Sequence, residues 1–356
     1  MSEAATVHLL VAGDPGQLTG GYRYDACIVE GLRALGRIVC VHGLPGRFPL
    51  ADDTARQSLA RTLAGLADDT TVVLDGLAAN GLPDVLMQHA GRLRLIGLIH
   101  HPLADETGLD TTTRAALLQA ESRAIEVLDH VVVTSVFTAD RLSALGMGGP
   151  ERTVIEPGVA RPALDERGET DCCQLLCVAS ITPRKGHDVL IEALAEITDL
   201  DWHCRLVGSM THAADWAVSI ERLIADRALE SRISLDGALT DKALARAYTQ
   251  ADLFVLASHY EGYGMVVTEA IAHGLPVVTT TGGALACTLP DGCGIAVAPG
   301  DAPALTGALR RLIASPERLE SCAQGARSAR ANLNHWPDAA RDFAAVLERN
   351  HRGVCS

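Results

Sequence analysis

The sequence predicts an α/β protein made of two doubly wound parallel-sheet domains. Short runs of apolar and β-branched residues alternate with longer amphipathic segments along the whole chain. Strand–helix–strand alternation of this kind favours parallel sheets covered by helices. The alternation stops near residues 160–172 and then starts again. The chain has 356 residues, and a typical domain has roughly 100–200, so each half is long enough to form its own core.

The first half gives a predicted Rossmann-like domain over residues 1–165. Its apolar runs are typical of buried strands and lie at Val7–Ala12, Ile38–His42, Thr71–Asp75, Leu93–His100 and Val131–Ser135. Stretches with helical spacing of apolar residues separate these runs and lie at Tyr22–Leu35, Thr54–Leu66, Thr112–Leu128 and Thr138–Leu145.

A break follows, with Pro157-Gly158, Pro162 and the polar stretch Asp165–Asp171, and this composition is typical of a linker. The second predicted domain covers residues 172–335 and repeats the alternation. Its strand patterns lie at Gln174–Ala179, Trp202–Val207, Arg232–Asp236, Leu253–Ala257 and Pro276–Thr280. Residues 336–356 are expected to form a last helix that packs back towards the first domain. Ligands bind at the carboxyl ends of strands in such sheets, so we expect a cleft where the two domains face each other.

Composition excludes several classes of protein. Hydrophobic residues make up 48% of the chain and charged residues 21%, with a mean hydropathy of +0.16, which is typical of a folded globular protein. The formal net charge is -14 and only 3% of residues are aromatic. Both values argue against nucleic acid as a partner, because phosphates would be repelled and bases would find few stacking surfaces.

The sequence also carries signals of cellular location. No apolar run reaches the ~18 residues of a membrane span, and the first residues lack the basic start of a secretory signal. The ten cysteines form no CxxC pair, and Cys172, Cys173 and Cys177 lack the spacing of a zinc site. We therefore expect reduced cysteines, no metal and a cytoplasmic protein, with peripheral contact at the inner membrane face left open.

A glycine-rich loop, Gly13–Gly21, joins the first strand to the first helix. Glycines let backbone N–H groups approach a ligand, and a helix N-terminus favours an anion. The loop is neither a GxGxxG fingerprint nor a P-loop. A tight turn without a ligand is the alternative reading.

Two adjacent cations, Arg184 and Lys185, follow the first strand of the second half within Ser180–Gly186. Arginine grips phosphate oxygens in pairs and lysine supplies a compact charge. Only two of the 30 basic residues are lysines, Lys185 and Lys242. The position of Lys185 at a strand end therefore favours a diphosphate site over a solvated basic turn.

The segment His259–Ala270 has the most specific pattern, with Glu261 in a glycine-flanked loop and Glu269 on the helix that follows. Carboxylates accept hydrogen bonds from paired hydroxyls, and the helix start near Tyr263–Met265 presents backbone donors. The segment therefore predicts a site for a polyol. The alternative interpretation is that Glu261 only caps the helix and that Glu269 is an exposed glutamate on it.

Two further segments of the chain carry polar side chains near strand ends. The pair His100-His101 ends a strand of the first half, where histidine can donate a hydrogen bond. The sequence Asp199-Leu200-Asp201 has the form of a metal-binding DxD, but it precedes a strand, so we interpret it as a turn at a helix end.

Taken together, these motifs resemble those of the retaining GT-B glycosyltransferases of family four. The similar segments are YEGYGMVVTEAIAHGLPVV, PRKGHDVLIEAL, VIEPGV and the two TGG turns at 19–21 and 281–283. The resemblance spans nearly the whole chain and is most specific over 175–300. It implies a GT-B fold, a nucleotide-sugar donor held by the second domain and an acceptor on the first.

The resemblance also implies residue roles. Arg184 and Lys185 would bind the donor diphosphate, Glu261 the sugar hydroxyls and Glu269 the ribose. In addition, Gly20, Gly21, Tyr263, Gly264 and Met265 would contact the sugar or phosphate. The family's histidine matches His101 best, with His100 second.

This chain departs from the family pattern in two places. Ala179-Ser180 stands where many relatives have Gly-Arg, and Ala284, Leu285 and Ala286 stand where many have an acidic residue.

The reaction that the resemblance implies is retaining transfer of a hexosyl group from a UDP- or GDP-linked sugar by front-side attack. The acceptor would be a glycan, a lipid-linked sugar or a small molecule. No cofactor or metal is expected. The alternatives are a GT-B sugar-nucleotide epimerase, a non-catalytic sugar-nucleotide-binding protein and a Rossmann dehydrogenase, the last disfavoured by the missing fingerprint.

Overall fold

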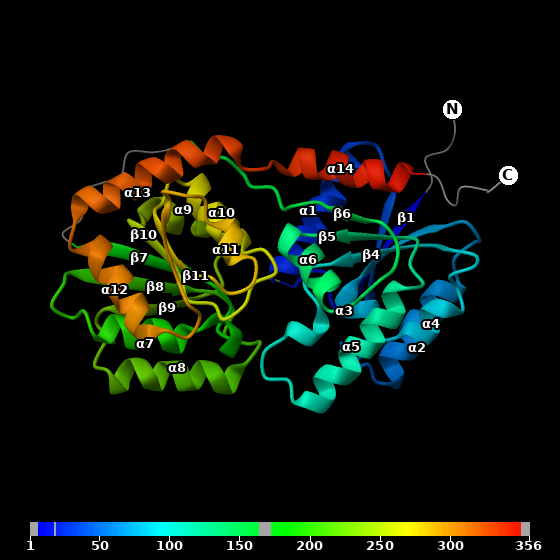
Figure 1. Cartoon of the computed structure of the whole chain (residues 1–356), viewed down its shortest axis with the longest axis horizontal. Coiled ribbons are helices and arrows are strands. Elements are labelled where there is room, and N and C mark those ends of the chain that lie inside the picture. The colour runs from blue at the N-terminus through cyan, green and yellow to red at the C-terminus, as the bar shows by residue number, and fades with distance from the viewer. Residues whose placement is uncertain (1–5, 18, 164–171, 350–356) are drawn as a thin grey trace. The chain divides into compact units, whose positions relative to one another are not determined.

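The computed structural model describes residues 6–17, 19–163 and 172–349. The chain forms two compact units, one from residues up to Gly158 together with those from Asn334 onward, and one from Val159–Leu333. Figure 1 shows both units with their helices and strands. Among the described residues, no helix combines the length and apolar character that crossing a membrane requires.

The first unit is built on a parallel sheet whose order is β2-β1-β3-β4-β5-β6. Its strands are β1 (Val7–Ala12), β2 (Val39–Leu44), β3 (Thr71–Asp75), β4 (Arg94–Ile99), β5 (His130–Val133) and β6 (Arg152–Val154). Its helices are α1 (Gly20–Ala34), α2 (Asp53–Ala64), α3 (Gly76–Ala79), α4 (Pro83–Met87), η1 (Leu103–Asp105), α5 (Thr111–Ile125), α6 (Val136–Ala144) and α14 (Trp336–Glu348).

Alternating side chains of the first sheet enter two different cores. Leu9 faces α1 and α14, where it lines a small cavity with Ile28 and Phe343. Leu10, one residue later, joins the core that includes Leu59 and Leu63 of α2. Because successive strand residues point to opposite faces, the apolar run of β1 covers both sides of the sheet. The helix α14 packs on α1, so the last helix of the chain completes the first unit (Figure 1).

The second unit is built on a parallel sheet whose order is β12-β11-β10-β7-β8-β9. Its strands are β7 (Cys173–Val178), β8 (Trp202–Val207), β9 (Ile233–Gly237), β10 (Leu253–Leu256), β11 (Val277–Thr280) and β12 (Gly294–Val297). Its helices are η2 (Pro183–Lys185), α7 (His187–Ala195), α8 (Ala214–Asp226), α9 (Asp241–Gln250), α10 (Met265–Ala272), α11 (Leu285–Thr288), α12 (Ala302–Ile313), α13 (Pro316–Ala329) and η3 (Arg330–Asn332).

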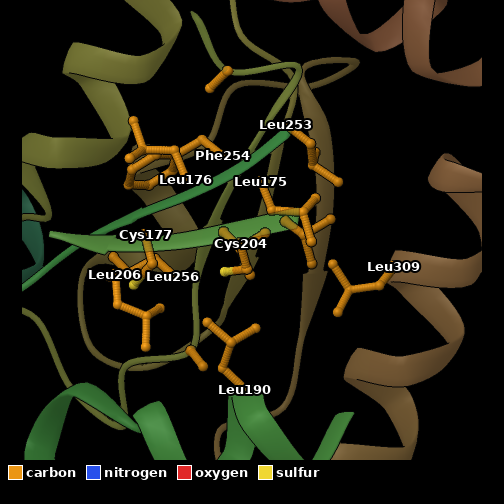
Figure 2. Close-up of a cluster of buried hydrophobic side chains, with 14 of the residues drawn as sticks. Leu175, Leu176, Cys177, Leu190, Cys204, Leu206, Leu253, Phe254, Leu256 and Leu309 are labelled. Carbon is orange, nitrogen blue, oxygen red and sulfur yellow. The ribbon is translucent and has the colours of Figure 1, made fainter. Parts of the chain in front are cut away.

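The core of the second unit lies on its central strands. Figure 2 shows side chains of β7, β8 and β10, including Leu175 and Cys204, together with Leu309 of α12. The strand β10 is fully buried along its length, as a central strand of a parallel sheet must be. The central position of β7 and β10 places the loops that follow them side by side at the carboxyl edge, where ligands bind in such sheets.

The structure confirms the predicted fold class of two parallel-sheet Rossmann-like units. For example, β4 lies within the predicted strand Leu93–His100. The elements that the sequence did not predict, α3, α4, β6, α11 and β12, have three to five residues each. Such segments are too short to show a hydrophobic period. The polar linker stretch Asp165–Asp171 and Cys355 lie outside the described residues. The cleft between the domains stays a prediction.

Candidate functional site

The loop after β7 is held against the loop after β10 by its backbone. Gly186 has a φ of 63°, and a Cβ built on it would lie 2.2 Å from the carbonyl oxygen of Ala257. Only glycine combines this left-handed conformation with such a close approach. The N–H of His259 also donates to the carbonyl of Arg184 at 2.8 Å. The turn that carries Arg184 and Lys185 is therefore placed next to residues 257–261.

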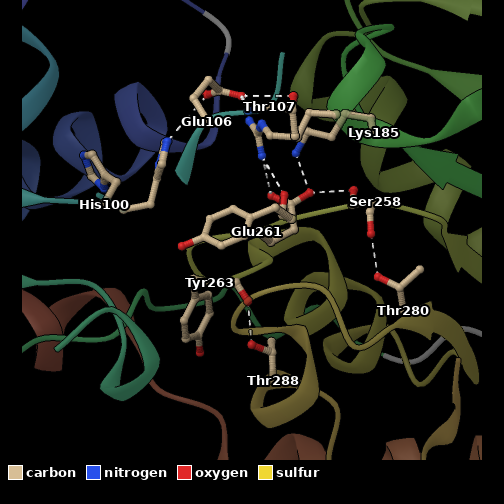
Figure 3. Close-up of polar contacts among 12 residues, drawn as sticks. His100, Glu106, Thr107, Lys185, Ser258, Glu261, Tyr263, Thr280 and Thr288 are labelled. Atoms are coloured by element: carbon tan, nitrogen blue, oxygen red, sulfur yellow. Dashed lines mark hydrogen bonds and ion pairs between the residues drawn. The ribbon is translucent and has the colours of Figure 1, made fainter. Parts of the chain in front are cut away.

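The side chains of this loop pair surround the carboxylate of Glu261. The Nζ of Lys185 lies 2.5 Å from Oε1 of Glu261, and the Nη1 of Arg184 lies 3.4 Å from Oε2. The Oγ of Ser258 donates to Oε1 at 2.7 Å. Figure 3 shows these contacts converging on Glu261. Arg184 also donates to the carbonyl of Tyr260 at 2.8 Å. Two cations and one carboxylate leave this cluster with one net positive charge.

Burial and pairing act in opposite directions on this cluster. Burial alone would raise the pKa of Glu261, but Lys185, Arg184 and the hydrogen bond from Ser258 outweigh it and lower the pKa to about 2. Burial lowers the pKa of Lys185, and the Glu261 carboxylate opposes that shift. The side chain of Lys185 is 16% exposed and that of Arg184 22%, so both cations remain within reach of an anion.

The Thr281-Gly282-Gly283 turn packs on the Glu261 loop through the backbone. The N–H of Ala284 donates to the carbonyl of Glu261 at 2.8 Å, and the N–H of Glu261 donates to the carbonyl of Gly282 at 3.3 Å. The hydroxyl of Thr280 donates to the carbonyl of Ser258 at 2.5 Å. These contacts give the second TGG turn a structural task, since it supports the loop that presents Glu261.

The helix α10 begins directly after Gly264, whose φ is 93°. Tyr263 precedes this glycine, and its carbonyl accepts a hydrogen bond from the hydroxyl of Thr288 at 2.5 Å. Glu269 lies further along α10, where its Oε2 accepts a hydrogen bond from the hydroxyl of Tyr248 at 2.9 Å. The structure thus brings Arg184, Lys185 and Glu261 together, while the carboxylate of Glu269 is held by a different partner.

In the first unit, the glycine loop lies against His100. Gly20 and Gly21 open α1, and a Cβ built on Gly21 would lie 3.1 Å from Cδ2 of His100. The Nε2 of His100 lies 3.1 Å from Oδ1 of Asp25. The Nε2 of His101 instead lies 3.5 Å from Oε2 of Glu106. Of the two predicted histidines, the second choice, His100, is therefore the one beside the glycine loop.

Comparison with known proteins agrees with this geometry. The family profile of the glycosyl transferases group 1 matches residues 168–329. The MMP alpha-(1->4)-mannosyltransferase of Mycolicibacterium hassiacum is 26% identical over 82% of this chain and 73% of its own length. The profile match over residues 168–329 identifies this chain as a glycosyltransferase. The matched region of this glycosyltransferase contains Arg184, Lys185, Glu261 and Glu269.

Solved structures agree on the fold of the glycosyltransferase. Sucrose-phosphate synthase from Thermosynechococcus elongatus superposes with a TM-score of 0.82 at 22% identity, covering 97% of this chain and 98% of that one. HepE of Anabaena, in complex with UDP-glucose, superposes with a TM-score of 0.75 at 18% identity, covering 97% and 100%. The two units of the glycosyltransferase thus have the GT-B fold.

Several polar residues of the glycosyltransferase were missed by the sequence analysis. Asp75 ends β3 at the carboxyl edge of the sheet, which is a signal that the sequence did contain. Asp25 lies on the buried face of α1, and Tyr248 lies on α9. The sequence does not show which residue either of them contacts.

The DxD segment forms a turn, as the sequence analysis predicts, and Asp199 is paired with Arg310 through contacts of 2.6 and 2.8 Å. Among the described residues, no group of three or more His, Cys, Asp or Glu side chains is arranged to hold a metal ion.

Proposed function

We propose that this glycosyltransferase is a retaining, metal-independent enzyme of family four that transfers a hexosyl group from a UDP- or GDP-linked sugar to a hydroxyl acceptor. The observation that carries this proposal is the cluster of Lys185, Arg184 and Glu261, because it holds two largely buried cations after β7 next to a carboxylate after β10. A diphosphate is a doubly charged group of matching size, and such groups bind where fixed cations and strand ends meet.

The proposed donor roles follow from the contacts. Lys185 and Arg184 would hold the diphosphate, and Glu269 would accept hydrogen bonds from the ribose hydroxyls. Tyr263, Gly264 and Met265 would present the start of α10 to the sugar or phosphate. The carboxylate of Glu261 would contact the sugar hydroxyls while it keeps both cations in place. Support for a nucleotide sugar also comes from HepE, which was solved with UDP-glucose.

The proposed reaction replaces one bond of the sugar carbon C1 by another. The bond from C1 to the diphosphate oxygen breaks, and the acceptor oxygen bonds to C1 from the same face. The acceptor proton passes to the departing phosphate oxygen. Lys185 and Arg184 would stabilise the negative charge that grows on this oxygen, which is the largest electrostatic change in the step. In the first unit, Gly20, Gly21 and a histidine would face the acceptor side, and the acceptor would be a glycan, a lipid-linked sugar or a small molecule.

A thermal-shift panel tests the donor. Purified protein would be heated with UDP-glucose, UDP-galactose, UDP-N-acetylglucosamine, GDP-mannose and NAD, since a ligand that binds only the folded state raises the melting temperature. We expect one nucleotide sugar to raise it and NAD to leave it unchanged. Stabilisation by NAD alone would instead favour a dehydrogenase.

Turnover then separates the remaining enzyme classes. The donor that stabilises the protein would be incubated with a panel of hydroxyl acceptors and, separately, with no acceptor. Transfer with retained anomeric configuration and with EDTA present is expected. Isomerisation of the donor sugar without any acceptor would identify an epimerase, and binding without turnover across the panel would favour a non-catalytic protein.

A further inference from the structure

A buried polar cluster lies at the carboxyl ends of β3 and β4 in the first unit. It contains His100 after β4, Asp75 at the end of β3 and Asp25 on α1. The Nε2 of His100 lies 3.1 Å from Oδ1 of Asp25, and their side chains are 20% and 5% exposed. This pair is distinct from the Lys185 cluster, which belongs to the second unit.

The ring of His100 is held from several sides. The Cα of Gly21 packs so closely that a Cβ there would lie 3.1 Å from the ring. The ring of Tyr24 meets it edge-on, with centroids 5.4 Å apart. Thr134 and Thr138 both donate to the carbonyl of His100 at 3.3 Å. These contacts fix both the backbone and the plane of the imidazole.

The carboxylate of Asp25 is costly to bury. Its Oδ2 is buried and has no hydrogen-bond partner among the described residues, and the surrounding side chains on that face include Leu9 and Ile28. A half-satisfied buried charge destabilises a fold, and an apolar residue in its place is often neutral or stabilising. Asp25 is therefore poorly explained as a packing residue, and its pairing with His100 points to a role in a site.

The second ring nitrogen of His100 is accessible. No bond from Nδ1 occurs among the described residues, and Nδ1 is not among their buried unpartnered atoms. The ring thus has one nitrogen paired with Asp25 and a second nitrogen that is not fully buried, at the edge of the sheet where ligands bind.

We propose that Asp25 is a positioning residue that fixes the tautomer and orientation of His100, so that Nδ1 is presented to an oxygen of the saccharide substrate. The inference rests on the proposed function and selects His100, rather than His101, as the histidine that contacts substrate. A carboxylate behind an imidazole sets which nitrogen carries the proton, as in other histidine sites.

The charges that face His100 agree with this role. Burial lowers its pKa, but Asp25 and Asp75 outweigh burial, so the pKa is raised above the ordinary value. Asp75, itself buried, has its pKa raised to about 7 by burial and by the charge of Asp25, with His100 opposing the shift. Tyr24 is a further titratable side chain that contacts the ring. A protonated His100 would donate from Nδ1 to a substrate oxygen.

Nuclear magnetic resonance of the histidine rings tests the proposal without any substrate. Two-bond ¹H–¹⁵N spectra of the full-length protein distinguish the two neutral tautomers, and the signals missing in His100→Gln identify the residue. Above its pKa, His100 is expected to carry its proton on Nε2. In Asp25→Asn, the titration midpoint of His100 is expected to fall by about one pH unit, because an opposite charge at this distance is lost.

Glu106→Gln is the matched control, because Glu106 stands beside His101 as Asp25 stands beside His100. It should leave the titration of His100 unchanged. A proton on Nδ1 in the neutral wild-type protein would overturn the proposal, even if Asp25→Asn failed to fold. An unchanged midpoint in folded Asp25→Asn would overturn it as well.

An activity measurement separates this inference from the proposed function. Hydrolysis of UDP-glucose and GDP-mannose without acceptor would be followed against pH in wild type and Asp25→Asn. The loss of activity at high pH should move down by about one unit in the variant. If none of the nucleotide sugars of the panel is hydrolysed or transferred to an acceptor, the proposed function loses its support, while the ring spectra still decide the role of Asp25.

Discussion

The ammonium of Lys185 and the carboxylate of Glu261 form an ion pair between residues that lie 76 positions apart in the chain. Because the pKa of Glu261 is lowered to about 2, its carboxylate is charged throughout the neutral range. The pair therefore keeps a cation at a fixed place at the carboxyl edge of the second sheet.

Replacing Lys185 by alanine should remove most of the transfer. The variant keeps Arg184 and Ser258 beside Glu261, so the fold is expected to remain. Loss of one fixed donor to a developing negative charge costs about 10²–10³ in rate. The rate would be measured with the donor found in the thermal-shift panel.

Lys242→Ala is the control, since Lys242 is the other lysine of the chain and lies exposed on α9. It should transfer at the wild-type rate. Equal rates for Lys185→Ala and wild type would remove Lys185 from the mechanism.

Gly186→Ala should separate the two loops of the candidate site. The new methyl group would meet the carbonyl of Ala257, 2.2 Å away, at a φ of 63°. We expect a loss of stability of roughly 1–3 kcal/mol from backbone strain and weaker donor binding, both measured by thermal shift with and without the donor.

Gly307→Ala gives the opposite expectation. Gly307 lies inside α12, and an added Cβ would have no atom within 4 Å. Alanine in the middle of a helix stabilises by roughly 0.5–1 kcal/mol relative to glycine, and donor binding should not change. A Gly186→Ala protein with unchanged donor binding would show that the close loop contact is dispensable.

Tyr248→Phe should weaken nucleotide binding without unfolding the protein. The change deletes only the hydroxyl that donates to Oε2 of Glu269, while the ring keeps its stacking on His273 at 4.7 Å. Loss of a hydrogen bond to a charged group costs roughly 1.5–3 kcal/mol. If Glu269 binds the ribose, the dissociation constant of the free nucleoside diphosphate should rise by about one to two orders of magnitude, as measured by calorimetry. Unchanged affinity with an unchanged melting temperature would remove Tyr248 from the nucleotide site.

Glu121 should make the stability of the first unit depend on pH. Its side chain is completely buried and accepts hydrogen bonds from Asn80 at 2.8 Å and from the N–H of Leu103 at 2.9 Å. Burial raises its pKa from 4.5 to about 7. A carboxyl whose pKa is raised on folding contributes stability that is complete below pH 4.5 and is lost as the pH rises through 7.

The variant Glu121→Gln cannot ionise and should lack this dependence. Its free energy of unfolding in urea, relative to that of wild type, should increase between pH 5 and pH 8, by something on the order of 3 kcal/mol, because only the wild type loses stability over this range. Glu126→Gln, at the exposed end of the same helix α5, should show no such trend. A constant difference between Glu121→Gln and wild type would contradict the raised pKa.

The sequence was enough to predict the fold class and the segments that form the candidate site. Parallel strands place their carboxyl ends at one edge, so segments after β7 and β10 had to come close in space. Arg184, Lys185 and Glu261 were found for this reason, and the structure brings them together. Their individual roles stay predictions, as do the metal independence, the acceptor and the cellular location.

The choice between His100 and His101 could not be made from the sequence. Adjacent residues after a strand point in different directions, and what each meets depends on distant elements. His100 meets Asp25 of α1, 75 positions away, whereas His101 meets Glu106 of its own loop. In the sequence, Asp25 is a single polar residue on the apolar face of a predicted helix. No local pattern around it indicates that its partner is His100.

The sequence by itself determined the alternation of strands and helices and the position of each motif at a strand end, because hydrophobic period and glycine placement are local properties. Only the tertiary structure decided which charges pair. The Lys185–Glu261 and Asp25–His100 contacts, and the return of α14 to α1, depend on long-range packing that no segment encodes alone. Since burial and pairing set the charge state of these groups, the chemistry of the candidate site follows from the fold.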